Sequence, residues 1–172
     1  MKLIGLVGQK QSGKDTCFGF FKQLAERENL RCIRYAFADT LKAEVSSLLG
    51  VSLAQIEQDK GVFRPFLQWY GTDFIRQYKK QPLYWINKID KQLDKARGTE
   101  HVIVLTDVRY ANEADLVIRY GGKLVKVTRP VISADFHSSE TDLAAIHCDD
   151  LIQNNSSLSE LQFEVEAVWN RL

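Results

Sequence analysis

The start of the chain constrains the fold most, because a short apolar run there leads directly into a glycine-rich loop. Residues 3–7 form an apolar run of the kind found in buried parallel strands. Gly8, Gly13 and Lys14 follow at the spacing GxxxxGK, and an amphipathic stretch comes directly after them. In such a loop the glycines let successive backbone N–H groups turn towards a phosphate, and the lysine adds a mobile charge. The pattern predicts a strand, a nucleotide-phosphate loop and a helix, in preference to a plain glycine-rich turn.

One detail departs from the general phosphate-loop motif, in which Ser or Thr follows the lysine. Here Asp15 follows Lys14, and the hydroxyl comes one residue later, as Thr16. This shift resembles the ending Gly-Lys-Gly-Thr of nucleoside monophosphate kinases more than the loops of GTPases or motor ATPases. Whether Thr16 would touch Mg²⁺ directly or contact a phosphate stays open at this point.

The chain has 172 residues, of which 45% are apolar and 26% charged, so we expect one well-buried domain. A net charge of +1 gives no global field that would favour nucleic acid or a membrane surface. Cys17, Cys32 and Cys148 are odd in number and widely spaced, which fits neither a disulfide framework nor a zinc site. No apolar run approaches the roughly 20 residues of a membrane helix, and the first run is too short for a signal peptide. These features predict a cytoplasmic protein with reduced cysteines.

Apolar periodicity predicts alternating strands and helices along the chain. The expected strands are at about 3–7, 31–37, 102–105, 124–127 and 151–153, and the expected helices at about 14–29, 40–49, 52–60, 64–78, 82–98, 111–120 and 158–172. Strands separated by helices favour an α/β fold: a doubly wound parallel sheet of about five strands with helices on both faces. We expect a single domain, with a helical region at about 39–97 and a loop at about 130–142.

Functional side chains gather at the carboxyl ends of the predicted strands, where ligands bind in such sheets. Besides the loop, Asp39, Asp107, Arg109 and Arg129 come directly after strands. Asp107 stands where a phosphate-loop protein places the carboxylate that orients Mg²⁺, directly or through water. Alternatively, Asp107 caps the next helix. The planar fork of Arg109 suits a phosphate, although Arg109 could instead pair internally with Glu113.

The helix after the second predicted strand offers another pair of candidates. Asp39 and Lys42 lie three residues apart on one helical face and could meet a second substrate. The alternative is that Asp39 only caps this helix.

An aromatic segment contains the third candidate group. Gln68, Thr72 and Arg76 recur every four residues and form a polar stripe on the predicted helix. A nucleobase and its phosphate would supply partners for this stripe, with Trp69 or Tyr70 stacking on the base. Core packing alone would account for the aromatic residues, so the polar stripe is what favours a ligand here.

Residues 87–90, Asn-Lys-Ile-Asp, match the NKxD box by which GTPases select guanine. In GTPases the box follows a strand late in the fold, whereas here it lies within a helical pattern upstream of Asp107. Residues 107–110 also differ from the DxxG motif of those proteins. We interpret the match as coincidence.

Segments in collinear order over most of the chain resemble the deoxynucleoside monophosphate kinases of tailed bacteriophages. The phosphate loop is shared by all kinases of this fold, whereas the DVR-x-x-NE block and the R-P…H-x-S-E segment are more diagnostic. The segments that carry the resemblance are Gly8 to Thr16, Phe37-Ala38-Asp39 with Leu41-Lys42, Leu67-Gln68 with Gly71-Thr72, Tyr84-Trp85, Asp107-Val108-Arg109-Tyr110 with Asn112-Glu113, Arg129-Pro130, and His137 with Ser139-Glu140.

The resemblance implies a single P-loop kinase domain over residues 1–172 that transfers the ATP γ-phosphoryl group to a deoxynucleoside monophosphate, with Mg²⁺. It implies small nucleotide substrates, no nucleic acid and no membrane, leaves a homodimer open, and places a phage-encoded member in the host cytoplasm. The implied residues are, for catalysis, Lys14, Asp107 and Arg129; for ATP, Gly8, Lys10, Ser12, Gly13, Lys14, Asp15, Thr16, Arg129 and Asn154; for the acceptor, Asp39, Lys42, Arg64, Gln68, Trp69, Thr72, Arg76, Trp85, Arg109, Glu113 and His137; and for Mg²⁺, directly or through water, Asp15, Thr16 and Asp107.

The expected mechanism follows from charge, because phosphoryl transfer depends mainly on positioning and on cancelling oxygen charge. Lys14 and Mg²⁺ would serve the donor, and Arg129 with Arg109 would bridge to the acceptor phosphate. No general base is needed, since that phosphate is already anionic. Residues 131–142 contain no Lys or Arg, so only His137 could add charge to this loop, which we expect to act as a lid.

Two other functions remain as alternatives. Residues 151–154, with Ser157 and Leu158 after them, also look like dephospho-coenzyme A kinases, which share the fold and the loop. A non-catalytic nucleotide-binding switch or assembly protein fits the sequence less well, because the guanine-binding and switch motifs of such proteins are missing or misplaced. Phosphorylation assays on deoxynucleoside monophosphates, AMP and dephospho-coenzyme A would separate these functions.

Overall fold

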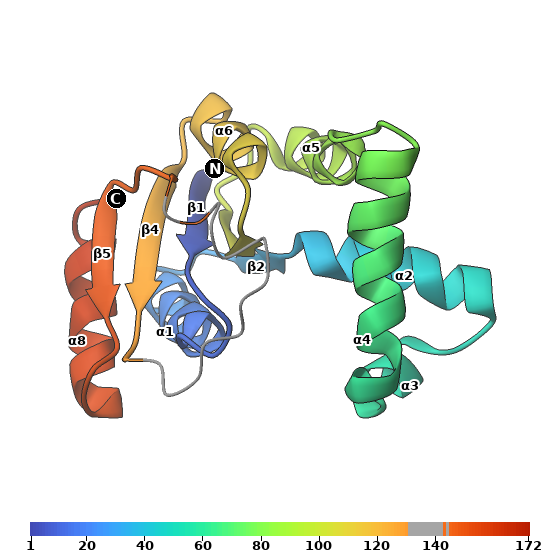
Figure 1. Ribbon diagram of the computed structural model, residues 1–172. Coiled ribbons are helices and arrows are strands. Elements are labelled where there is room, and N and C mark those ends of the chain that lie inside the picture. Colours follow the sequence, from blue (N-terminus) through green and yellow to red (C-terminus); the bar gives the residue numbers. More distant parts are fainter. Residues whose placement is uncertain (131–142, 144) are drawn as a thin grey trace. The chain divides into compact units, whose positions relative to one another are not determined.

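The computed structural model describes residues 1–130, 143 and 145–172 (Figure 1). The chain forms two compact units. The first contains residues 1–35 and 96–172, and the second contains residues 36–95. In the described part of the chain, no helix is long and apolar enough to cross a membrane. Cys17, Cys32 and Cys148 are all free thiols.

The first unit is built on a five-stranded sheet in which every pair of neighbouring strands is parallel. The strands are β1 (Lys2–Val7), β2 (Cys32–Tyr35), β3 (Val102–Val108), β4 (Lys123–Thr128) and β5 (Asp150–Gln153), in the spatial order β2-β3-β1-β4-β5. The central strands β1 and β3 are almost entirely buried, because helices cover both faces of the sheet. The predicted α/β fold with a parallel sheet of about five strands is therefore confirmed.

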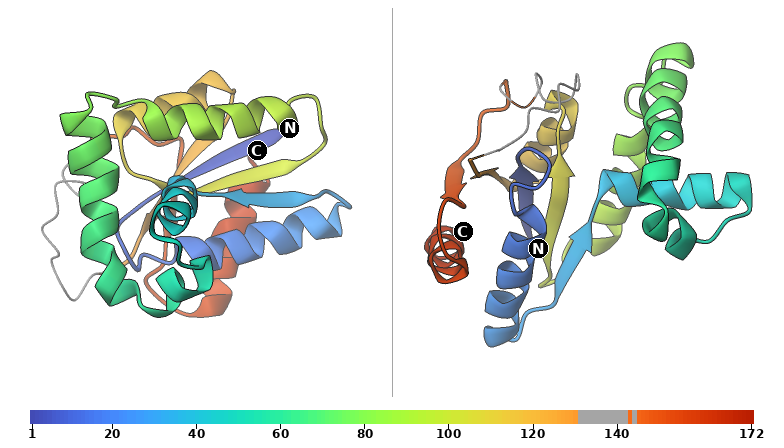
Figure 2. Two further views of the ribbon diagram at one scale, coloured as in Figure 1. Left: turned by 90° about the vertical axis from the view of Figure 1, so that its right-hand side faces the viewer. Right: turned by 60° about the horizontal axis from the view of Figure 1, so that its bottom comes forward.

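Helices cover both faces of this sheet (Figure 2). Helices α1 (Lys14–Arg27) and α8 (Leu158–Trp169) pack against each other on one face, and α6 (Ala111–Arg119) packs on the other, against β1 and β4. The main core lies between the sheet and the pair α1 and α8, where the rings of Phe21 and Trp169 are 6.4 Å apart. On the opposite face Gly5 lets α6 approach closely, since a Cβ at Gly5 would lie 2.9 Å from the side chain of Val117.

The second unit is entirely helical. It contains α2 (Phe37–Leu49), α3 (Leu53–Gln58), α4 (Lys60–Gln68), the π-helix η1 (Trp69–Tyr78) and α5 (Tyr84–Ala96), whose last residue belongs to the first unit. Ser52 is the N-cap residue of α3: its side chain accepts the Gln55 N–H, and the Gln55 side chain accepts the Ser52 N–H in return. The Asn-Lys-Ile-Asp segment lies inside α5, as the helical pattern predicts.

Several boundaries differ from the sequence prediction, and two of them concern candidate site residues or their neighbours. The second strand ends at Tyr35 rather than at residue 37, and Phe37 begins α2 after the extended N-cap residue Ala36. The alternation of Ile33, Tyr35 and Phe37 suggested a longer strand because an apolar residue at the start of a helix fits the same pattern. In addition, β3 continues to Val108, so Asp107 lies in the strand and not after it.

Candidate nucleotide-binding site

In the loop between β1 and α1, the backbone requires glycine at two positions, as in a phosphate loop. Gly13 has φ 103°, a left-handed conformation that other residues rarely adopt. A Cβ at Gly8 would clash with the Val127 carbonyl oxygen and lie 2.8 Å from Ser12 Oγ. Gly13 is also the N-cap residue of α1, so no capping side chain competes with a ligand for the first N–H groups of the helix.

The Lys14 ammonium group lies over the loop backbone. Its Nζ donates to the carbonyl oxygens of Gly8 and Gln9, at 2.8 and 2.6 Å, and to Ser12 Oγ at 3.4 Å. Ser12 itself is 1% exposed. The loop therefore combines the half-buried Lys14 ammonium group with the backbone N–H groups at the start of α1. This arrangement suits a polyanionic ligand.

Asn154 supports the loop from the end of β5. Its Nδ2 donates to the Ser12 carbonyl oxygen at 2.9 Å, and its backbone N–H donates to the Thr128 carbonyl oxygen at 2.7 Å. The amide lies so close that a Cβ at Gly13 would clash with Nδ2. The structure thus gives Asn154 a role in shaping the loop, and its predicted contact with ATP stays a prediction.

The carboxyl end of β3 lies beside the phosphate loop, because Val108 pairs with Val7. Asp107 does not cap α6, whose N-cap residue is Tyr110, so the alternative of a helix cap is wrong. The buried Glu113 carboxylate accepts the backbone N–H groups of Arg109 and Tyr110, at 2.9 and 3.3 Å. Glu113 therefore holds the turn that carries Arg109, through backbone contacts.

Arg34 is a candidate that the sequence analysis missed. It comes from the edge strand β2, and its Nη1 donates to Oγ1 of Thr106 at 2.9 Å. Thr106 is 3% exposed and directly precedes Asp107. An arginine in the middle of a short, otherwise apolar strand was the available signal, since it places a charge at the carboxyl half of the sheet.

The Mg²⁺ prediction concerns Asp15, Thr16 and Asp107. Asp15 and Thr16 are exposed in the first turn of α1, and Asp107 is half-buried in β3. Among the described residues, no group of three or more His, Cys, Asp or Glu side chains could hold a metal by itself. This donor set fits Mg²⁺, which proteins usually bind through one or two carboxylates together with substrate phosphates.

Arg129 and the lid loop lie at the end of β4. Arg129 follows Thr128, the last residue of β4, and is exposed. His137 and the rest of the predicted lid, residues 131–142, lie outside the described residues.

In the second unit, Asp39 and Lys42 belong to an ion-pair cluster. Lys42 Nζ lies 2.5 Å from a Glu57 carboxylate oxygen and 3.8 Å from Asp39, and Lys60 Nζ lies 2.7 Å from Glu57. Hydrogen bonds from Lys42 and Lys60 lower the pKa of Glu57 to about 2. Ala36 is the N-cap residue of α2, so the alternative role of Asp39 as N-cap is wrong.

The aromatic segment is helical, as predicted, but it changes from α to π geometry at Trp69. Phe66, Tyr70, Phe74 and Tyr78 form one stacked row, with successive ring centroids 6.1, 5.8 and 5.8 Å apart. The predicted acceptor residues Arg64, Gln68, Trp69, Thr72 and Arg76 lie on these two helices. Arg64 and Trp69 are exposed, and the polar stripe is half-buried.

Trp85, another predicted acceptor residue, is 2% exposed. Its Nε1 donates to the Gly71 carbonyl oxygen at 3.0 Å. This hydrogen bond joins α5 to η1 and gives the indole a structural role, while contact with the acceptor stays a prediction.

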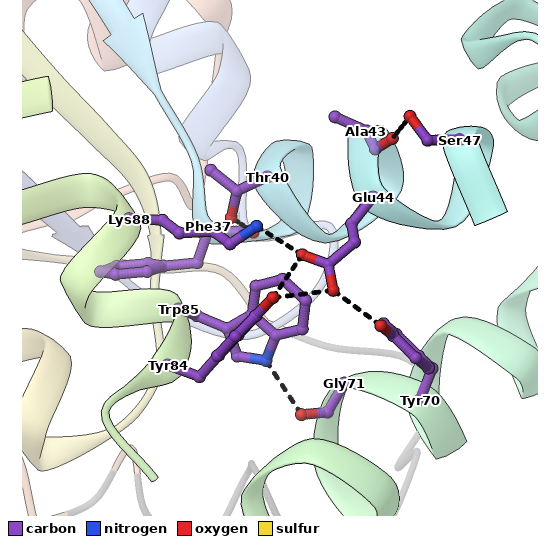
Figure 3. A network of polar contacts seen from close by, with 10 residues as sticks. All are labelled: Phe37, Thr40, Ala43, Glu44, Ser47, Tyr70, Gly71, Tyr84, Trp85 and Lys88. Carbon is purple, nitrogen blue, oxygen red and sulfur yellow. Dashed lines mark hydrogen bonds and ion pairs between the residues drawn. The ribbon is translucent and has the colours of Figure 1, made fainter. Parts of the chain in front are cut away.

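Glu44 on α2 is the second residue that the sequence analysis missed (Figure 3). Its carboxylate accepts hydrogen bonds from Tyr70, Tyr84 and Lys88. Burial alone would raise the pKa of Glu44, but the hydrogen bonds from these three residues outweigh it, so the pKa lies below its usual value. No motif surrounds Glu44 in the sequence, because its partners come from helices distant along the chain.

Comparison with known proteins places the chain in a family. The deoxynucleotide monophosphate kinase family matches residues 51–165. A protein of Acanthamoeba polyphaga mimivirus, named "Putative deoxynucleotide monophosphate kinase", is 34% identical over 96% of this chain and 94% of its own length. The chain belongs to the deoxynucleotide monophosphate kinase family. It is therefore a phosphotransferase, and this family is favoured over the dephospho-coenzyme A kinases.

The kinase shares its fold with solved structures of other small-molecule kinases. The Mycobacterium tuberculosis APS kinase in complex with AMPPNP and APS has a TM-score of 0.57 and 12% identity, covering 98% of this chain and 97% of its own. A gluconokinase from Sinorhizobium meliloti has a TM-score of 0.51 and 17% identity, and the match covers 99% of this chain and 92% of the gluconokinase chain. At these identities the likeness supports the fold of the kinase and not its substrate.

Proposed function

We propose that the kinase transfers the γ-phosphoryl group of ATP to a deoxynucleoside monophosphate and so forms ADP and a deoxynucleoside diphosphate. The observation that carries this proposal is the phosphate loop closed around the Lys14 ammonium group, in a chain of the deoxynucleotide monophosphate kinase family. Because such substrates are small cytosolic metabolites, we infer that the kinase works in the cytoplasm.

The reaction needs positioned cations more than an acid or a base. An oxygen of the acceptor phosphate forms a bond to the γ-phosphorus, while the bond from that phosphorus to the bridging oxygen of ADP breaks. The acceptor oxygen is already anionic, so no proton has to be removed. Lys14 would leave its loop acceptors for the donor phosphates, and Arg129 would approach the transferred group from the end of β4.

Mg²⁺ would be held by the Thr16 hydroxyl and the carboxylates of Asp15 and Asp107, directly or through water. When bound, it neutralises the phosphate oxygens of ATP. Asn154 and Gly13 shape the loop backbone, whose N–H groups would bind the phosphates.

The second unit would bind the acceptor. Gln68, Thr72 and Arg76 would meet its polar groups, and Trp69 would stack on the base. The remaining proposed contacts are Asp39, Lys42, Arg64 and Trp85 in the second unit, Arg109 and Glu113 in the first unit, and His137, which lies outside the described residues. Of these, Lys42, Trp85 and Glu113 already make structural contacts within the protein.

Turnover measurements on a panel of acceptors test the proposal. We expect phosphorylation of one or more deoxynucleoside monophosphates, and a loss of roughly 100- to 1000-fold in kcat for Lys14→Ala, because a cation that meets the transition state is removed. Lys22→Ala is the matched control, since Lys22 lies on the surface of α1 and pairs only weakly with Glu26 at 3.8 Å. Activity on dephospho-coenzyme A alone, or normal turnover of Lys14→Ala, would contradict the proposed function.

A further inference from the structure

One carboxylate connects three helices of the second unit (Figure 3). Tyr70 Oη, on η1, donates to Glu44 Oε1 at 2.6 Å. Tyr84 Oη, on α5, lies 2.9 Å from Oε1 and 2.8 Å from Oε2, and the ammonium group of Lys88 donates to Oε2. Burial and the hydrogen bond to Glu44 raise the pKa of Tyr70 to about 12, so this phenol stays a donor at all working pH values.

The π geometry of helix η1 makes its hydrogen bonds to neighbouring helices important. The hydrogen bonds within η1 span five residues, as in the bond of 2.8 Å from the Lys79 N–H to the Phe74 carbonyl oxygen, and such π geometry is rare. Polar contacts with α2 and α5 hold η1 from outside, among them Tyr70 to Glu44 and the Gly71 carbonyl oxygen to Trp85 Nε1 at 3.0 Å. Tertiary contacts therefore fix the position of these turns.

The same turns carry the residues proposed to bind the acceptor. Tyr70 lies between Gln68 and Thr72 in the sequence, and its ring stacks between those of Phe66 and Phe74. A shift of the Tyr70 hydroxyl would therefore move the polar stripe with it. Glu44 itself belongs to none of the surfaces proposed for ATP or the acceptor, and its carboxylate oxygens are occupied by protein donors.

We propose that Glu44 is a positioning residue for the acceptor nucleotide, which it controls by holding Tyr70 and thereby η1 in the binding arrangement. This inference rests on the proposed function of the second unit. A residue that only stabilised the fold would lower the melting temperature without changing the affinity for one substrate selectively. A positioning residue changes the acceptor KM and leaves the ATP KM and the limiting kcat nearly unchanged.

A double-mutant cycle tests this role. The variants are Glu44→Gln, Tyr70→Phe and the double variant, and each is assayed for kcat and for both KM values. We expect Glu44→Gln to raise the acceptor KM about tenfold, the effect of losing one charge-assisted hydrogen bond, with less than about a twofold change for ATP. Since Glu44 acts through Tyr70, the double variant should be no worse than the more affected single variant.

Ser52→Ala is the matched control, because it removes the capping box of α3 and so destabilises the same unit without touching the network. Its acceptor KM should stay normal. Equal rises in both KM values for Glu44→Gln, additive effects in the double variant, or a rise in the acceptor KM of Ser52→Ala would each overturn the role of Glu44.

Failure of the proposed function itself would look different. In that case the wild-type protein would phosphorylate no deoxynucleoside monophosphate. Calorimetric titration of wild type and Glu44→Gln with the best acceptor, in the absence of ATP, gives a second readout. An unchanged dissociation constant in Glu44→Gln, with an active wild type, would overturn the positioning role alone.

Discussion

At Gly13 a left-handed backbone and a neighbouring side chain restrict the same residue. Its φ of 103° disfavours any side chain, and a Cβ would also clash with the amide of Asn154. We expect Gly13→Ala to lower the free energy of unfolding by about 1–3 kcal/mol, because the strain adds to the clash. It should also weaken binding of a non-hydrolysable ATP analogue, since the loop N–H groups are displaced.

Gly19→Ala is a control for the Gly13 substitution, because Gly19 lies inside the helix that Gly13 precedes. Gly19 lies in α1, and no atom would lie within 4 Å of an added Cβ. Alanine there should raise the free energy of unfolding by about 0.4–1 kcal/mol. Urea denaturation and calorimetry of both variants measure these effects. A Gly13→Ala protein that is as stable as wild type and binds the analogue normally would contradict the loop geometry.

The role proposed for Arg129 would distinguish a kinase from a simple nucleotide binder. Arg129 is exposed at the end of β4 and precedes a proline, which stiffens the chain there. A guanidinium group that meets the phosphoryl group mainly in the transition state affects kcat and not ATP binding. We expect Arg129→Ala to lower kcat roughly 100- to 1000-fold, with partial recovery in Arg129→Lys.

Steady-state kinetics and titration with the ATP analogue measure the two effects for Arg129. Arg27→Ala is the control, because Arg27 is a surface arginine that pairs with Glu166 at 3.1 Å, remote from the loop in sequence. An unchanged kcat for Arg129→Ala would mean that Arg129 is only a surface charge. Full recovery by lysine would show that charge, rather than the planar fork, is what the reaction needs.

The sequence predicts single residues well where the chemistry is local. Gly8, Gly13 and Lys14 lie within seven residues of one another, and the geometry of their loop follows from glycine and helix-terminus rules. Arg34 and Glu44 could not be found in this way. Their partners, Thr106 and Lys88, are 72 and 44 residues away along the chain, and only the folded chain brings them together.

For helices and strands too, local features could be predicted and features that depend on distant contacts could not. The N-terminus of α3 was predictable because a serine and a glutamine three residues apart satisfy each other's backbone. The end of β2 was not predictable, since β2 is an edge strand that, among the described strands, pairs with β3 alone. Periodicity alone does not show where such pairing stops, because a neighbouring strand decides it.

The change from α to π geometry at Trp69 could not be predicted from apolar periodicity either. A spacing of four residues keeps Phe66, Tyr70, Phe74 and Tyr78 close to one face in either kind of helix. Contacts with other helices distinguish the two, such as the hydrogen bond from Trp85 to the Gly71 carbonyl oxygen. The sequence therefore predicted a helix here but not its hydrogen-bond pattern.

For the whole molecule, alternation of strands and helices was enough to predict a parallel sheet but not its order. Burial does not decide whether β1 or β3 pairs with β2, because both strands are almost entirely buried. The division into two units was not apparent from composition, since residues 36–95 are also rich in apolar side chains.

The stability of the whole molecule should depend on pH through Glu57. Lys42 and Lys60 lower its pKa in the folded protein to about 2, against 4.5 for an unperturbed glutamate. A lowered folded-state pKa means that the stabilisation is complete above about pH 4.5 and is lost as the pH falls towards 2. Glu44, whose pKa is also lowered, contributes in the same direction.

Urea denaturation of wild type and Glu57→Gln from pH 6 to about pH 2 measures the Glu57 contribution. The Glu57 side chain is 43% exposed, so solvent screening limits its effect to about 0.2–1 kcal/mol. We expect wild type to be more stable than Glu57→Gln by this amount at pH 6, and the difference to vanish near the folded-state pKa. Screening predicts a smaller difference in about 1 M salt. A difference that stays constant from pH 6 downwards would show that the two lysines do not hold Glu57 in its ionised form.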